Sequence, residues 1–379
     1  MSTPLPSYER WGSLVGKRVL VRVDFNTPVA EIAGQLQVTD DFRIRATVPL
    51  FEDLLERGAT VVACTHFGRP HGEVVAKYSV APVRKRLDEL CPDVQLLENL
   101  RFNPGEESND RAFGEALIAG FDYYINEAFS ASHRPHASIM IPPLLVPSAA
   151  GPNLQREVST IQSLLDDPAR PFVAIIGGAK VKDKLGIARV LSERADTVIV
   201  GGGMAFTFEV TQGRTIGSSL FDASYEQECG ELMAGGKVLI PEDSLGLADS
   251  ASFGSDGGSD PVIEFGANVP EGFTGLDIGP RARASFANAI ARAKTILWNG
   301  PMGVFEDARF SAGTEAVARA VAASDAVSVI GGGDSVAALR SYGLEGDVSF
   351  VSTGGGASLE LVELGDLPGL KALRESPFN

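Results

Sequence analysis

Short apolar runs alternate with longer amphipathic stretches along the whole chain of 379 residues. The runs are rich in Val and Ile and show no regular polar alternation, which is typical of parallel strands that are buried on both faces. We predict strands at 19–23, 60–64, 94–97, 123–125, 172–176, 197–200, 238–240, 295–298, 326–330 and 349–351.

Between these runs, apolar residues recur at helical spacing. We predict helices over 44–57, 83–90, 154–165, 184–194 and 282–293. Strand–helix alternation over a whole chain indicates an α/β fold with parallel sheets flanked by helices. The length suits two domains. Pro and Gly interrupt the periodicity at 141–153, so we expect a domain boundary there and a surface loop at 250–260.

Charge and cysteine content exclude several classes of protein. The net charge of −16 is unsuited to general nucleic-acid binding or to an anionic membrane surface. The three cysteines, Cys64, Cys91 and Cys229, lack C-x-x-C spacing, so we expect no disulfide framework, no zinc site and a reduced, cytoplasmic compartment. The N-terminus lacks the apolar core of a signal peptide.

In the first half, residues that follow predicted strands are rich in Arg and His. Ligands of open parallel sheets bind beyond the carboxyl ends of the strands. The residues at these ends are Asp24, Phe25, Asn26, His66, Gly68, Arg69, Arg101, His133 and Arg134, and Arg43 opens the next predicted helix. Guanidinium groups suit carboxylate and phosphate, so we infer a small polyanionic ligand. Each Arg alone could equally form a surface salt bridge; their shared location favours an anion site.

In the second half, glycine occupies the equivalent positions, in the runs 176–180, 200–204, 299–303, 330–335 and 352–358. Glycine allows close backbone approach, and the helix N-termini that follow can bind phosphate. Lys180 and Lys184 add positive charge, and Asp334 is a natural carboxylate for Mg²⁺. One such turn could reflect tight packing alone, but five at successive strand ends indicate a nucleotide site.

Other phosphate-binding and catalytic motifs are missing from the sequence. It contains no G-x-x-x-x-G-K-[ST], no G-x-G-x-x-G and no G-x-S-x-G. His133 and His136 are spaced like metal ligands but lack suitable Cys or acidic partners, so we expect no metal site there.

A series of motifs resembles the phosphoglycerate kinase family. They are RVLVRVDFNTPV (18–29), THFGRP (65–70), LLENLRF (96–102), NEAFSASHRPHAS (126–138), GGAKVKDK (177–184), GGGMAFTF (201–208), LDIGP (276–280), WNGPMGVFE (298–306), IGGGDS (330–335) and STGGGASLEL (352–361). They come in the family's order and cover nearly the whole chain. The resemblance implies two Rossmann-like lobes that face each other across a cleft. It implies an N-terminal lobe (1–153) for the phosphoglycerate substrate, an interlobe helix (154–167), a C-terminal nucleotide lobe (168–360) and a tail (361–379) that returns to the first lobe.

The resemblance also implies an activity and its residues. The reaction would be reversible, Mg²⁺-dependent phosphoryl transfer between 1,3-bisphosphoglycerate and ADP, giving 3-phosphoglycerate and ATP, in glycolysis and gluconeogenesis, with hinge closure of the lobes. The implied substrate contacts are Asp24, Phe25, Asn26, Arg43, His66, Phe67, Gly68, Arg69, Arg101 and Arg134. The implied nucleotide contacts are Lys180, Lys184, Gly201, Gly202, Gly275, Asn299, Pro301, Glu306, Gly332, Gly333, Asp334 and Ser335. Arg43, Lys180, Lys184, Gly332 and Gly355 would be catalytic, and Asp334 would bind the metal.

The sequence departs from the family's pattern at a few positions. Phe67 replaces a smaller aliphatic residue, Ser130 and Ser132 change the common G-T-A-H-R run, and Ser335 replaces a frequent Thr. Two alternatives stay open: a kinase of the same fold that acts on another phosphorylated acid, and a non-catalytic binder of nucleotide or phosphate. We expect a monomer whose partners are small molecules.

Overall fold

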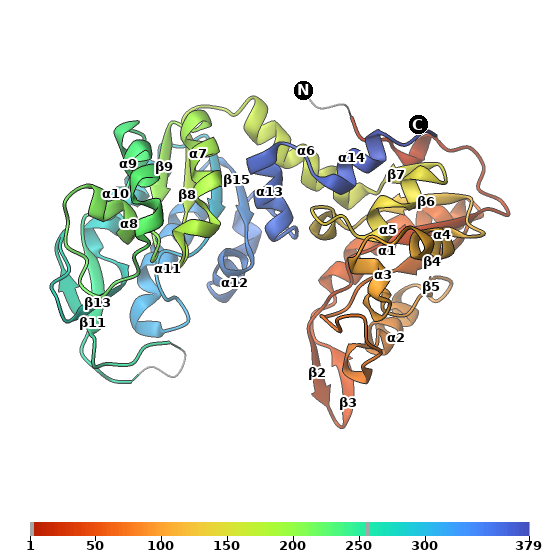
Figure 1. Cartoon of the computed structure of the whole chain (residues 1–379), viewed down its shortest axis with the longest axis horizontal. Helices are drawn as coiled ribbons and strands as arrows, with labels where there is room; N and C mark the ends of the chain where they lie inside the picture. Colours follow the sequence, from red (N-terminus) through yellow and green to blue (C-terminus); the bar gives the residue numbers. More distant parts are fainter. Residues whose placement is uncertain (1–3, 255–257, 379) are drawn as a thin grey trace. The chain divides into compact units, whose positions relative to one another are not determined.

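The computed structural model describes residues 4–254 and 258–378. The chain divides into two compact units (Figure 1). The first unit contains the residues up to Ser159 together with those from Leu364 onward, and the second contains Thr160–Glu363. Each unit is built around its own parallel sheet, so each is described separately.

The sheet of the first unit has five strands in the order β5-β4-β1-β6-β7. All neighbouring strands run parallel. Their bounds are β1 Arg18–Arg22, β4 Thr60–Cys64, β5 Gln95–Leu96, β6 Tyr123–Asn126 and β7 Ser148–Ala150. An antiparallel hairpin of β2 (Val29–Ile32) and β3 (Gln35–Val38) precedes the first helix. The parallel register places the carboxyl ends of β1, β4 and β6 at one edge of the sheet.

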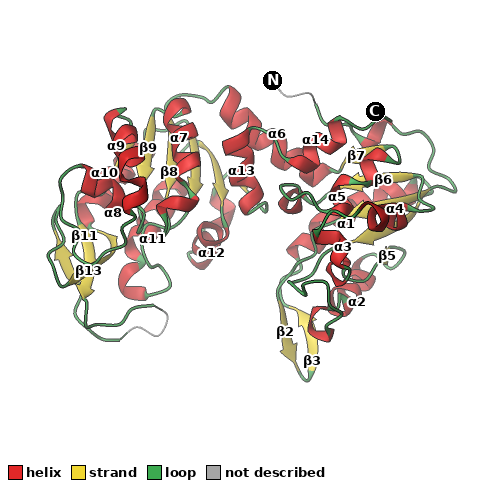
Figure 2. Cartoon of the chain, viewed as in Figure 1, coloured by secondary structure: helices red, strands yellow, loops and turns green. Residues whose placement is uncertain are grey.

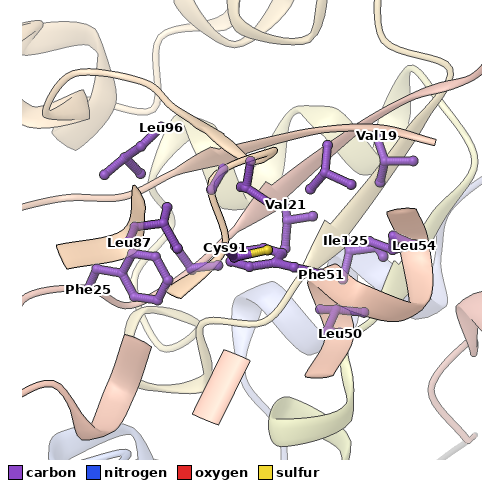
Figure 3. Close-up of a cluster of buried hydrophobic side chains, with 14 of the residues drawn as sticks. Val19, Val21, Phe25, Leu50, Phe51, Leu54, Leu87, Cys91, Leu96 and Ile125 are labelled. Atoms are coloured by element: carbon purple, nitrogen blue, oxygen red, sulfur yellow. The ribbon is translucent and has the colours of Figure 1, made fainter. Parts of the chain in front are cut away.

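The first unit also contains α1 (Phe42–Glu56), α2 (Ala81–Leu90), α3 (Pro104–Glu107), α4 (Arg111–Ile118), α5 (Ala137–Met140) and α14 (Pro368–Arg374). Helix α6 (Pro152–Asp166) begins in the first unit and ends in the second. Helix α1 packs on β4, and its apolar face supplies Leu50, Phe51 and Leu54 to the core. Figure 3 shows these side chains beside Val21 of β1 and Phe25. Burying one such Leu or Phe side chain stabilises a fold by about 1.5–3 kcal/mol.

The sheet of the second unit has six parallel strands in the order β10-β9-β8-β14-β15-β16. Their bounds are β8 Phe172–Ile176, β9 Thr197–Val200, β10 Val238–Leu239, β14 Thr295–Asn299, β15 Val327–Gly331 and β16 Phe350–Val351. A separate antiparallel sheet contains β11 (Ser244–Ala248), β12 (Ile263–Phe265) and β13 (Phe273–Ile278). Every residue of the central strands β8 and β14 is buried, as the apolar pattern of a strand covered on both faces predicts.

The helices of the second unit are α7 (Leu185–Arg194), α8 (Ala205–Thr211), α9 (Glu226–Ala234), α10 (Pro280–Ile290), α11 (Ala312–Ala322), α12 (Gly333–Ser341) and α13 (Gly356–Leu364). Figure 2 shows helices beside the strands of each unit. The core of the second unit includes Trp298 of β14, Phe286 of α10 and Val317 of α11. Helix α12 begins two residues after β15 ends, and α8 and α13 begin five residues after β9 and β16 end.

The C-terminal residues pack within the first unit. The Gly369 N–H donates to the Ser132 carbonyl at 2.8 Å, and Leu370 and Leu373 are fully buried. A side chain at position 369 would meet Ile139 at 2.7 Å, so α14 lies close to α5. These contacts make α14 part of the first unit's core.

The α/β fold class and its parallel sheets confirm the prediction from the sequence pattern. All ten predicted parallel strands are present, with ends that shift by a residue or so. The two antiparallel sheets were not predicted. In the first of them, the short strands β2 and β3 are mostly exposed and lack an apolar run. Of the loop predicted at 250–260, residues 255–257 lie outside the described residues, and the rest contains no helix or strand. No described helix combines the length and apolar character needed to cross a membrane.

Candidate active site

Asp24 lies just beyond β1 and forms an ion pair with Arg43. Arg43 is the second residue of α1, and its Nη1 donates to Asp24 Oδ2. The Arg43 side chain is one-third exposed, whereas that of Asp24 is 13% exposed. Burial raises the pKa of Asp24, but the charge of Arg43 and further hydrogen bonds outweigh burial and hold this pKa below its usual value. Arg43 therefore has its partner at a strand end, inside the predicted site.

Hydrogen bonds connect Asn26, which bonds Asp24 through its N–H, with Gly68 beyond β4 and with Arg101. The Gly68 N–H donates to Asn26 Oδ1 at 2.9 Å, and Arg101 Nη1 donates to the Gly68 carbonyl at 2.8 Å. Gly68 has a φ of 61°, and a side chain there would overlap the Tyr78 ring at 2.4 Å. Glycine is therefore required at this junction, which aligns Asn26 with Arg101.

His66 is almost completely buried beside another guanidinium. Arg22 Nη2 lies 3.2 Å from His66 Nδ1. Burial and the charge of Arg22 hold the pKa of His66 well below its ordinary value, so this imidazole is neutral near pH 7. His66 can therefore offer a hydrogen bond to a ligand but no positive charge.

Arg101 carries its charge in a partly dehydrated setting. Its Nε lies 3.2 Å from Glu107 Oε1. Burial lowers the pKa of Arg101, and the positive charges of Arg22 and Arg134 lower it further. The positive charges of Arg22 and Arg134 thus act on Arg101, and an anionic ligand beside Arg101 would offset this repulsion.

The remaining predicted substrate residues differ in accessibility. Arg69 is exposed and forms no hydrogen bond or ion pair within the described part of the chain. Arg134 is also exposed, and its Nε donates to His133 Nε2 at 3.1 Å. The Phe25 and Phe67 side chains are buried, so only their backbone groups could meet a ligand.

Several buried polar residues that support this site escaped prediction. The fully buried Arg22 donates to Ser138 Oγ at 2.9 Å and lies 3.8 Å from Glu106, while Asn99 bonds both backbone groups of Phe67. The signal for Arg22 was a charged residue within the apolar run RVLVRV. A buried Arg needs buried partners, but the sequence does not reveal which residues supply them.

In the second unit, Lys184 cross-links the ends of two central strands. Its Nζ donates to the Gly177 carbonyl at 2.6 Å, the Asn299 carbonyl at 3.1 Å and Asn299 Oδ1 at 2.7 Å. Burial lowers the pKa of Lys184 to about 8, against the opposing charges of Asp334 and Asp183. Lys180 and Lys184 are four residues apart in the sequence, a spacing that would place them on one face of a helix. Instead they flank the short 3₁₀ turn Val181–Asp183, with Lys180 exposed and Lys184 turned inward.

The turn after β15 presents the N-terminus of α12. Gly332 is the N-cap residue with a φ of 85°, and the first intrahelical bond joins the Val336 N–H to its carbonyl. The N–H groups of Gly333, Asp334 and Ser335 therefore precede the helical ladder and can bind phosphate oxygens. Ser335 Oγ accepts from the Gly300 N–H at 2.5 Å, which ties this turn to the end of β14. The cap is a glycine, so Asp334 is not the N-cap residue.

Glycines allow the other strand ends of this unit to meet closely. A side chain at Gly177 would lie 2.0 Å from the Pro301 carbonyl, and one at Gly201 would lie 2.4 Å from Met302 Sδ. Gly202 has a φ of 68°, and its N–H donates to the Met302 carbonyl at 3.0 Å. These close approaches bring the ends of β8, β9 and β14 together.

Gly275 and Glu306 belong to the same unit, but Gly275 of β13 is buried whereas Glu306 is exposed. The Gly275 N–H donates to Ser219 Oγ at 2.9 Å, and a side chain there would overlap the Phe206 ring. The Val304 N–H donates to the Leu276 carbonyl, which holds the segment leading to the exposed Glu306 beside β13. Gly355, with a φ of 56°, precedes α13 and gives a second helix N-terminus.

No three His, Cys, Asp or Glu side chains within 4–254 and 258–378 are grouped so that they could hold a metal ion alone. Asp334 is a single exposed carboxylate beside free helix N–H groups. Magnesium typically takes one or two carboxylates and completes its coordination with substrate phosphates and water. The residues therefore fit a magnesium ion that arrives with a nucleotide.

Comparison with known proteins gives a consistent result. The family model described as phosphoglycerate kinase matches residues 12–95 and 92–364. The phosphoglycerate kinase of Rubrobacter xylanophilus is 47% identical, with 96% of each chain covered, and that of Moorella thermoacetica is 46% identical, with 96% of this chain and 97% of the relative covered. The structure of phosphoglycerate kinase from Coxiella burnetii has a TM-score of 0.88 at 34% identity and covers 98% of this chain and 99% of its own.

These matches extend over both units, and the motifs that form the two sites lie within the matched ranges. The chain therefore belongs to the phosphoglycerate kinase family.

Proposed function

We propose that the first unit binds phosphoglycerate, the second binds the magnesium nucleotide, and the residues assigned above carry the phosphoryl transfer. As a family member the chain is a phosphotransferase with a carboxyl group as acceptor, a phosphoglycerate kinase. The observation that carries the division of labour is the gathering of Arg69, Arg101 and Arg134 beyond the strand ends of one unit, against helix N-termini and Lys184 on the other.

The anionic substrate would be bound by Arg69, Arg101 and Arg134. Among the described residues Arg69 is exposed and has no side-chain partner, and the positive charge of Arg134 lowers the pKa of Arg101. The Asp24 carboxylate would repel the charged groups of this substrate. We therefore propose that Asp24 accepts a hydrogen bond from the substrate's hydroxyl group. Asn26, His66 and Gly68 would supply uncharged contacts.

Catalysis would rest on alignment and charge neutralisation. The nucleophile is the substrate carboxylate, or in reverse a phosphate oxygen of ADP, and both are already ionised, so no general base is required. Arg43 would stabilise the transferring group together with Lys180, Lys184 and the N–H groups around Gly332 and Gly355. Since these residues belong to two units, we propose that the units close during turnover and exclude water.

Asp334 would hold magnesium, and the N–H groups of the Gly332–Ser335 turn would bind the phosphates of the nucleotide. Bound magnesium supplies positive charge that neutralises phosphate oxygens. Gly201, Gly202, Gly275, Asn299, Pro301 and Glu306 would surround the rest of the nucleotide. We further propose a cytoplasmic monomer, on the basis of the reduced cysteines and the small-molecule substrates.

Crossed binding measurements test this division. Isothermal titration of full-length protein would compare the wild type with Arg69→Ala in the first unit and Asp334→Asn in the second. Arg69→Ala should weaken 3-phosphoglycerate binding about tenfold, the worth of one hydrogen bond to a charged group, and leave MgADP binding unchanged. Asp334→Asn should weaken the binding of MgADP but not the binding of metal-free ADP. Loss of both ligands in either variant, or the reverse pattern, would refute the assignment.

A further inference from the structure

Ser130 departs from the family's common pattern and contacts Asp24, the predicted substrate carboxylate. It lies in the turn Phe129–Ala131, beyond β6, and interrupts the family's common G-T-A-H-R run. Its Oγ donates to Asp24 Oδ2, the same oxygen that accepts from Arg43. The other oxygen, Oδ1, accepts from the Asn26 N–H at 3.1 Å. A hydroxyl from one strand end thus shares an acceptor with a guanidinium from α1.

This shared acceptor matters because Arg43 has two partners during the proposed reaction. In the structure Arg43 pairs with Asp24, whereas phosphoryl transfer requires its guanidinium at the transferring group. When Arg43 leaves, Asp24 loses its nearest positive charge while staying largely dehydrated. A carboxylate in that position needs other donors to stay oriented.

The groups that face Asp24 limit which donors remain. They are Arg43 from α1, His66 beyond β4, Ser130 beyond β6, and the backbone of Asn26. Among the described residues, the neutral His66 imidazole contacts Arg22 and forms no hydrogen bond with Asp24. Ser130 is therefore the side-chain hydrogen-bond donor available to Asp24 after Arg43 has moved.

We propose that Ser130 is a positioning residue: its hydroxyl holds the Asp24 carboxylate in place while Arg43 moves from Asp24 to the phosphoryl group. The inference rests on the proposed function, because it requires Asp24 at the substrate and Arg43 at the transferring group. A hydroxyl suits this role because it donates to a carboxylate without bringing a charge that would repel Arg43.

Kinetics of Ser130→Ala and Ser130→Thr test the inference, with Ser132→Ala as the matched control. Ser132 lies in the same segment, but its hydroxyl bonds the Ala128 carbonyl and Asn126 and has no contact with Asp24. In Ser130→Ala, KM for 3-phosphoglycerate should rise about tenfold, with a smaller change in kcat. The acid limb of kcat/KM against pH should move to higher pH, because the hydroxyl helps to keep Asp24 ionised. Ser130→Thr, which keeps the hydroxyl, should restore both.

The outcomes separate this inference from the proposed function. Wild-type protein without activity on 3-phosphoglycerate would overturn the proposed function. With an active wild type, an unchanged KM and acid limb in Ser130→Ala would overturn the inference alone. Two results would give Ser130 a merely structural role. One is an equal rise of KM in Ser130→Ala and Ser130→Thr, and the other is the same acid-limb shift in Ser132→Ala. As a readout besides activity, the ¹³C shift of the Asp24 carboxyl should titrate at higher pH in Ser130→Ala than in wild type.

Discussion

Arg43 is the residue on which catalysis depends most in this account. Its ion pair with Asp24 would hold its charge at the proposed site before the phosphoryl group binds. Arg45, two residues further on, points elsewhere and bonds Asp41 at 2.8 Å. The two neighbouring arginines therefore have different partners and, we expect, different roles.

Arg43→Ala should lower kcat by about 10²-fold, the scale of losing one preorganised charge contact in the transition state. The dissociation constant of 3-phosphoglycerate should change much less, because the proposed contacts Arg69, Arg101 and Arg134 would still bind its anionic groups. Arg43→Lys should restore activity only in part, since an ammonium lacks the planar fork. Normal kcat with weaker substrate binding would assign Arg43 to binding alone.

Lys184 gives a prediction about pH. Its folded-state pKa of about 8 lies below the ordinary value of 10.5, because burial disfavours the charge. The free enzyme thus loses the Lys184 charge as pH rises through about 8, and kcat/KM for MgATP should fall there. The unfolded chain holds this proton longer, so the Lys184 contribution to stability should rise from pH 8 to 10.5.

Lys184→Ala should reduce kcat/KM for MgATP by about 10²-fold and should lack this alkaline limb. A pH series on both proteins, with circular dichroism as a folding control, checks the prediction. If the wild type and Lys184→Ala share the same alkaline limb, another group is responsible for it.

Some residues of the candidate site could be predicted from the sequence, and others could not. The exposed Arg69 and Arg134 and the strand-end Asp24 could be predicted, because they sit where parallel strands end. The inward turn of Lys184 could not, since it depends on Asn299 of β14, which lies 115 residues further along the chain. The partners of Arg22 were hidden for the same reason.

At the scale of elements, the start of α6 depends on one buried carboxylate. Glu127, which follows β6, accepts hydrogen bonds from the Asn153 and Leu154 N–H groups and from the Asn153 side chain. The same Asn153 amide donates to the Ala46 carbonyl of α1 at 2.9 Å. Glu127 therefore joins β6, α6 and the helix that carries Arg43.

Glu127→Ala should lower the free energy of unfolding by about 2–4 kcal/mol, because it leaves several donors at the α6 N-terminus without an acceptor. Burial raises the pKa of Glu127 to about 7, above the ordinary value of 4.5. The unfolded chain releases this proton first, so the Glu127 contribution to wild-type stability should fall as pH rises from 4.5 through 7.

Urea unfolding at several pH values checks both parts. The pH dependence between 4.5 and 7 should be weaker in Glu127→Ala than in wild type. A variant as stable as the wild type at pH 7 would contradict the capping role.

Elements with long apolar runs were predictable from the sequence, and those with half-buried short strands were not. Strands β8 and β9 follow the predicted bounds, because burial on both faces leaves a continuous apolar signal. The antiparallel sheet β11–β13 contains glycines at 246 and 275 and has a register shift near Leu245, which obscure any alternation. Its role in presenting Gly275 was therefore implied only by the family resemblance.

At the scale of the whole molecule, the chain combines two units of the same architecture with different chemistry at their strand ends. All four histidines and the substrate arginines Arg69, Arg101 and Arg134 belong to the first unit. Glycine turns and helix N-termini occupy the strand ends of the second. This contrast follows from the sequence alone, since it needs only the order of strands and the residues after them. The return of α14 to the first unit rests on packing, which no local pattern reveals.

The most direct test of the central claim is a coupled assay of acyl phosphate formation by the full chain. Turnover should require 3-phosphoglycerate, ATP and magnesium together, and a panel of other phosphorylated acids should give far lower kcat/KM. A folded protein that turns over another acid in preference to 3-phosphoglycerate, or that binds both ligands without turnover, would contradict the account.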